Sequence, residues 1–154
     1  MYVPMVIALM FLFPLVSIVV QILLTDHGAL TAAVALGIIA KWYVFWAVGV
    51  RLSLAGIRQI VQPRYTAQTI LGLTGSDSLI LVRELGIANA AIGATGLSTL
   101  FAPSWVAPLA MLGAIFYGLA GINHCFHKNR NRLQNLALVS DLFAGLILGI
   151  CFVT

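Results

Sequence analysis

Apolar runs of about 20 residues or more make up most of this chain, and they constrain its fold more than any other feature. A helix of that length matches the roughly 30 Å of hydrocarbon in a bilayer. Hydrophobic residues account for 62% of the chain and charged residues for 8%, whereas a soluble domain carries about 25% charged residues. The runs are continuous and do not alternate, which favours helices over the strands of a barrel. We therefore predict an all-α integral membrane protein.

Five of these runs qualify as membrane spans. We expect a single transmembrane domain over residues 1–154, a helical bundle with a four-helix core plus an N-terminal helix. The region before residue 25 lacks a basic start and a small-residue cleavage site, which favours a retained helix over a secretory signal, the alternative left open. Pro63 should end the second helix, and residues 65–73 read as a short interfacial helix. The predicted spans are 2–24, 30–57, 79–101, 106–126 and 133–153.

The positions of the charges predict the orientation of the bundle. The loops after spans two and four hold five basic residues, and those after spans one and three hold Asp26 and His27. Basic residues mark cytoplasmic loops, so we expect an inner-membrane protein with a cytoplasmic N-terminus and a C-terminus outside. No basic patch is interleaved with aromatic residues, so the net charge of +4 does not indicate nucleic-acid binding. The five basic residues are Arg58, Arg64, Lys128, Arg130 and Arg132.

The second span carries a polar stripe. At 100° per residue, its five polar residues fall within an arc of about 100°, which must face other helices or water and not lipid. Glu84 and Asp141 are the two acidic residues predicted within the membrane, where an ionised side chain costs about 3 kcal/mol or more. Such residues are site candidates by default. The stripe consists of Lys41, Arg51, Arg58, Gln59 and Gln62.

We predict that these charges converge in a buried pocket that opens toward the cytoplasm. Glycines at helical spacing in spans three, four and five would let the helices pack closely around it. The alternative is purely architectural, with polar pairs that hold the helices in register. The pocket candidates are Lys41, Arg51, Arg83, Glu84, Asn89, Tyr117, His124 and Asp141.

Metal binding and catalysis find little support in the sequence. His124 and His127 are weak metal candidates, because they lie about one helical turn apart but no third ligand is evident besides Asp141. A bis-histidine haem fits less well, since His27 is expected on the opposite side of the membrane. No phosphate-binding loop or nucleophile–base arrangement is present, so we assign no catalytic residue.

Several motifs together resemble a known family. KWYVFW from Lys41, RELGIAN from Arg83, YGLAGINH from Tyr117 and the Ser140-Asp141 pair are similar to an uncharacterised family of small bacterial multi-pass membrane proteins, a domain of unknown function. The resemblance covers about residues 40–150. A looser resemblance, carried by Arg51, Pro63 and the RELG motif, is to DoxX-like proteins. These are four-helix bundles, some linked to quinone and thiosulfate oxidation, and here the first span would be an addition.

Three functions follow as hypotheses. The first is a non-enzymatic or accessory protein that binds a small ligand or lipid in the polar pocket, alone, as a homo-oligomer or within a larger membrane complex. The second is a quinone-associated redox subunit, in which Tyr117 and His124 hydrogen-bond the quinone oxygens and a carboxylate relays protons. The third is a small proton-coupled carrier that uses Glu84 and Asp141.

Overall fold

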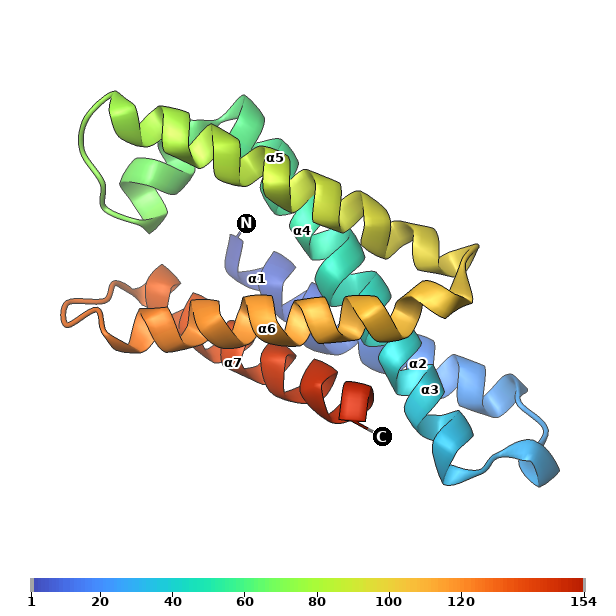
Figure 1. Cartoon of the computed structure of the whole chain (residues 1–154). Coiled ribbons are helices and arrows are strands. Elements are labelled where there is room, and N and C mark those ends of the chain that lie inside the picture. Colours follow the sequence, from blue (N-terminus) through green and yellow to red (C-terminus); the bar gives the residue numbers. More distant parts are fainter. Residues whose placement is uncertain (1, 154) are drawn as a thin grey trace.

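The computed structural model describes residues 2–153, apart from the side chains of Tyr2, His27 and Val153 (Figure 1). Met1 and Thr154, the ends of the predicted domain, lie outside the described residues. Within this range the chain forms helices joined by loops, without a strand. Five helices are long and apolar enough to cross a membrane, which confirms the predicted fold class. They run over Val3–Leu24, Ala32–Val61, Asp77–Leu100, Pro103–Cys125 and Arg132–Phe152.

The first two spans are each divided by a short stretch of wider, π-helical turns. Span three is α5 with the short η5, span four is η6 with α6, and span five is α7. A short helix, η4, is present where one was predicted over residues 65–73. The bounds are α1 Tyr2–Ile7, η1 Ala8–Leu12, α2 Phe13–Leu24, η2 His27–Ala29, α3 Ala32–Tyr43, η3 Val44–Val50, α4 Arg51–Val61, η4 Tyr65–Ile70, α5 Asp77–Leu97, η5 Ser98–Leu100, η6 Pro103–Trp105, α6 Val106–Cys125 and α7 Arg132–Val153.

Two helix pairs, α4 with α5 and α6 with α7, form the main packing units. The second span, which comprises α3, η3 and α4, runs obliquely past the others and contacts α2, α5, α6 and α7 (Figure 1). The loops over 62–76, in green, and 126–131, in orange, lie at one end of the molecule, and the loops over 25–31 and 98–105 lie at the other (Figure 1). The two basic loops therefore share one end.

Small residues bring α5 into close contact with the second span. A Cβ atom built on Gly56 would lie 2.5 Å from the Ala90 backbone nitrogen, and one built on Gly96 would lie 2.5 Å from the Gly49 nitrogen. No side chain fits at such separations, so the backbones meet directly, as in other membrane helix pairs with small residues at the interface. The predicted small-residue face of the third span is thus confirmed.

The centre of the bundle is a mainly apolar core that also holds a polar cluster around Arg51 and Asp141. Side chains from η1, η3, α6 and α7 fill it, among them Met10, Val44, Val48 and Leu148, each fully buried. Large apolar side chains such as Leu81, Phe101 and Leu146 are exposed on the outside. An outer surface this apolar suits contact with lipid and not with water.

Candidate functional site

Arg51 and Asp141 form an ion pair in the middle of the bundle. Arg51 Nη2 donates to Asp141 Oδ1 at 2.7 Å and to Ser140 Oγ at 3.0 Å, and Nη1 contacts Met10 Sδ at 3.4 Å. The two charged side chains are only 10% and 8% exposed. Two charges taken out of water in this way stabilise one another only with good geometry and further hydrogen bonds. Ser140 supplies such a bond from the turn that carries Asp141.

The π-helical turns of η3 shape the site beside Arg51. The Arg51 backbone N–H donates to the Trp46 carbonyl, five residues back, and so passes over the Ala47 carbonyl. The hydroxyl of Tyr117, which reaches across from α6, donates to that Ala47 carbonyl oxygen. The Tyr117 ring lies under the guanidinium, with Arg51 Cζ 4.9 Å from the ring centroid. A local widening of the helix thus positions both the arginine and the tyrosine.

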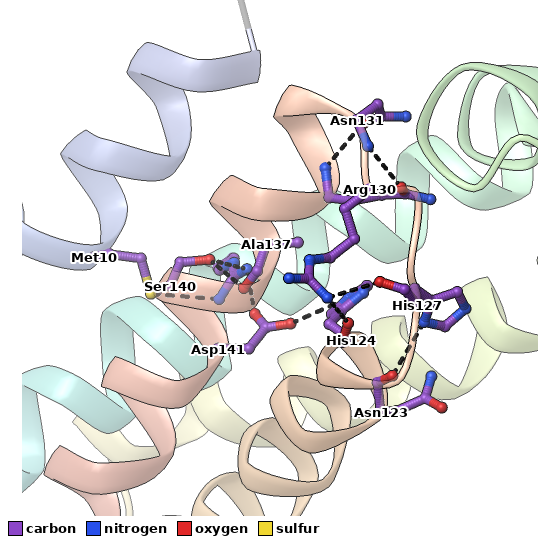
Figure 2. A network of polar contacts seen from close by, with 11 residues as sticks. Met10, Asn123, His124, His127, Arg130, Asn131, Ala137, Ser140 and Asp141 are labelled. Carbon is purple, nitrogen blue, oxygen red and sulfur yellow. Dashed lines mark hydrogen bonds and ion pairs between the residues drawn. The ribbon is translucent and has the colours of Figure 1, made fainter.

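His124 extends this cluster toward the end of the molecule that carries the basic loops. Its Nε2 lies 3.8 Å from Asp141 Oδ2, the carboxylate oxygen opposite the one that Arg51 binds. Figure 2 shows the resulting network of polar contacts, which extends from Met10 through Ser140 and Asp141 to His124. The His124 and Asp141 side chains keep 14% and 8% exposure. A separation of 3.8 Å exceeds a direct hydrogen bond, and it lets one polar atom beside the pair contact both groups.

Arg130 fastens the neighbouring loop to the same helix end. Its Nη1 donates to the backbone oxygens of His124 at 2.9 Å, Cys125 at 3.2 Å and His127 at 2.7 Å, and its Nε donates to Asn135 Oδ1 at 3.0 Å (Figure 2). The His124 and Cys125 carbonyls belong to the last turn of α6, where oxygens at a helix end take donors from outside the helix, and the His127 carbonyl lies in the loop beyond it. Arg130, which was predicted to mark the cytoplasmic side, therefore also caps the C-terminal end of α6 beside the site.

Lys41 lies apart from this cluster. Its ammonium contacts Gln21 Oε1 at 3.4 Å and sits 5.0 Å from the centroid of the Trp42 ring. Gln21 is on α2, close to the opposite end of the molecule from His124. The structure therefore does not bring Lys41 to the carboxylates.

Three further candidates belong to α5. Asn89 is buried and donates from Nδ2 to Gln59 Oε1 at 2.9 Å, so it forms a separate contact within the α4–α5 pair. Arg83 and Glu84 are exposed on the outer side of the same helix. Of the eight predicted pocket residues, the structure joins four: Arg51, Tyr117, His124 and Asp141.

The histidine pair does not extend into a metal site among the described side chains. The rings of His124 and His127 lie 6.0 Å apart, and the His127 ring nitrogen Nδ1 contacts the Asn123 carbonyl at 3.0 Å. Among the described side chains, no three His, Cys, Asp or Glu groups are placed to hold one ion. The side chain of His27, considered above for haem, lies outside the described residues.

Two contributors to the site were not predicted. Met10 gives a soft sulfur acceptor from the π-helical turn of the first span, and nothing in its apolar surroundings marks it as a partner of arginine. Ser140 stands next to Asp141 and within a quoted motif, so its position held a signal. Its hydrogen bond with Arg51 depends on which face of α7 is turned toward the second span, and the sequence does not specify that face.

An apolar groove opens sideways between α5 and α6, separate from the polar cluster. It has a volume of 470 Å³ and is lined by Ile92, Pro108, Met111, Leu112, Ile115, Phe116 and Leu119. Phe116 touches the ring of Tyr117 edge-on, with centroids 5.3 Å apart. The groove faces the region where lipid chains would lie, and its lining suits hydrocarbon.

The fold and the buried cluster define a multi-pass helical membrane protein with an intramembrane ion pair. The chain belongs to a family of unknown function, DUF6790, which it matches over residues 4–154. No curated protein and no solved structure matches it. The predicted membership of an uncharacterised family is confirmed, whereas the likeness to DoxX proteins stays a prediction.

Proposed function

We propose that this protein is a non-enzymatic, accessory protein of the inner membrane that binds a small polar molecule or a lipid headgroup between Asp141 and His124. One observation carries the proposal. Arg51 holds Asp141 Oδ1 at 2.7 Å, while Oδ2 faces His124 Nε2 across 3.8 Å. The ion pair thus orients the carboxylate, and its second oxygen remains available to a ligand.

The chemistry of this gap defines the ligand class. Carboxylate Oδ2 accepts hydrogen bonds, and a neutral imidazole nitrogen donates or accepts according to its tautomer. A hydroxyl or amide group placed beside the pair, within hydrogen-bond distance of each atom, would bond to both. The gap lies toward the basic loops, so under the positive-inside rule it opens to the cytoplasm, with the N-terminus on that side and the C-terminus outside.

The geometry gives less support to the quinone hypothesis. A quinone oxygen needs a donor, and the Tyr117 hydroxyl proton is directed at the Ala47 carbonyl. His124 would remain as the single donor of the expected pair. The proton-carrier hypothesis likewise loses one of its two carboxylates, because Glu84 is exposed on α5 and Asp141 is buried in the centre.

The test is to purify the protein in mild detergent and to identify bound small molecules by native mass spectrometry and solvent extraction. We expect a bound molecule in the wild type and in His127→Ala, and its loss in His124→Ala. His127 is the matched control because it lies one turn away and makes no contact with Asp141. A wild type without any bound molecule, or equal occupancy in both variants, would leave the architectural alternative in place.

A further inference from the structure

Lys41 is a cation within a membrane span that has no acidic partner. Among the described side chains, no carboxylate lies within 4.0 Å of its ammonium. Its polar contact is to Gln21 Oε1 at 3.4 Å, and this same oxygen also accepts from Trp42 Nε1 at 2.5 Å. An ammonium carries three donors, so most of its hydrogen-bonding capacity is left for a group outside the protein.

The depth of Lys41 places it near a membrane surface. Gln21 precedes Leu24, the last residue of α2, by three residues or about 4.5 Å along the helix axis. The contact between Gln21 and Lys41 therefore lies just inside the end of the molecule that carries the 25–31 loop. Trp42 and Trp46 lie beside it, in keeping with the preference of tryptophan for the membrane interface.

A groove runs along α2 next to this cation. It has a volume of 400 Å³, and between Val16 and Leu24 it follows α2 for about 12 Å. Its two polar side chains are directed at tryptophans: Gln21 accepts from Trp42, and Ser17 Oγ accepts from Trp46 Nε1 at 2.9 Å. The groove is therefore mostly apolar, and the Lys41 ammonium adjoins it through its contact with Gln21, one of the lining side chains. The lining consists of Val16, Ser17, Val20, Gln21, Leu24 and Trp42.

We propose that this groove binds a glycerophospholipid with an anionic headgroup. The phosphate pairs with the Lys41 ammonium, and one acyl chain lies along α2 between Val16 and Leu24. A lysine near the interface gains from a nearby anion, and a phosphodiester is the anion that the membrane surface supplies at this level. This lipid site is independent of the ligand proposed beside Asp141, which lies toward the other end of the bundle.

The first test is native mass spectrometry of the purified protein with phosphatidylglycerol and with phosphatidylcholine of the same acyl chains. We expect preferential binding of phosphatidylglycerol, weakened about fivefold in Lys41→Gln and retained in Lys41→Arg. Lys128→Gln, at an exposed loop lysine, is the matched control and should bind as the wild type does. Unchanged phosphatidylglycerol binding in Lys41→Gln, or displacement of the lipid by inorganic phosphate alone, would overturn the proposal.

A second test locates the acyl chain. In Trp46→Phe/Trp105→Phe, Trp42 is the remaining tryptophan, and phosphatidylglycerol with brominated chains should quench it more strongly than brominated phosphatidylcholine does. Val20→Trp in the otherwise unchanged chain, read by mass spectrometry, fills the groove but keeps Lys41 and Trp42, and it should reduce lipid binding. Equal quenching by the two lipids, or full lipid binding by the filled groove, would contradict the placement.

Discussion

Asp141 and Arg51 are 90 positions apart in sequence, yet Arg51 Nη2 lies 2.7 Å from Asp141 Oδ1. The contact joins the last span to the second, and it is surrounded by the first and fourth. Because both charges are buried, each depends on the other: removal of either leaves an uncompensated charge inside the bundle. The stability of the four-helix centre therefore depends on this pair.

Asp141→Asn should destabilise the protein by about 3 kcal/mol, because Arg51 would remain charged and buried without a counter-ion. Thermal unfolding in detergent measures the effect. Glu84→Gln makes the same chemical change at an exposed position and should leave the melting temperature unchanged. Arg51→Met/Asp141→Leu should recover much of the loss, and an equal loss in the double variant would contradict the reciprocal dependence.

Tyr117→Phe should cost about 1–3 kcal/mol, because the buried Ala47 carbonyl would lose its hydroxyl donor. The ring under Arg51 would remain, so the loss isolates the hydrogen bond. Tyr65→Phe serves as the control, since its ring also lies under an arginine, with Arg58 Cζ 3.8 Å from the centroid. Equal stabilities of the two variants, measured by thermal unfolding, would show that the hydroxyl contributes nothing.

Gly56→Ala should destabilise the α4–α5 pair by about 1–3 kcal/mol, because its Cβ would meet the Ala90 backbone at 2.5 Å. Gly37→Ala is the matched control in the same span, where an added Cβ meets nothing within 4 Å. That substitution should be neutral or should stabilise the helix by up to about 1 kcal/mol. Melting temperatures that move in the same direction for both would argue against direct backbone contact.

Arg130→Gln should release the loop over 126–131, because two backbone carbonyls in the last turn of α6 and the His127 carbonyl in the loop would lose the Arg130 donor. Hydrogen exchange of the amides in this loop and in the last turn of α6 should become faster. Lys128→Gln removes a neighbouring charge without such contacts and should leave the exchange rates unchanged. A loop that stays protected in Arg130→Gln would show that its other contacts are sufficient.

The proposed orientation can be tested with the native cysteines. Cys125 is exposed beside the basic loops. In Cys151→Ala, Cys125 is the remaining cysteine, and a membrane-impermeant maleimide applied to intact cells should fail to label Cys125. In Cys125→Ala/Cys151→Ala/Ser104→Cys, the cysteine introduced at the opposite end should be labelled without lysis. The reverse pattern would invert the orientation.

The number of spans was predictable because each is a continuous apolar run of sufficient length. The direction of individual side chains was harder to derive. Lys41 and Arg51 were placed on one face by assuming 100° per residue throughout the second span. The wider turns of η3 lie between them and advance fewer degrees per residue, so the two side chains face different helices. The VFWAVGV sequence of η3 contains no pattern that predicts π-helical turns.

The orientation of the two acidic side chains was also hard to derive from the sequence. Glu84 and Asp141 both follow the start of a span and were treated alike. The buried face of α5 is formed by Val82, Gly86 and Asn89, which turns Glu84 outward. The ion pair of Asp141 with Arg51 was among the combinations expected, but choosing it required knowledge of which helices are neighbours.

The second span has a further consequence for the membrane that holds this protein. At 30 residues it is about 45 Å long, well beyond the roughly 30 Å of a hydrocarbon core. Tilt is one way in which such a helix relieves hydrophobic mismatch, and Arg51 lies within it. A thinner bilayer would increase the tilt and a thicker one would reduce it. Bilayer thickness therefore acts on the central ion pair through this one helix.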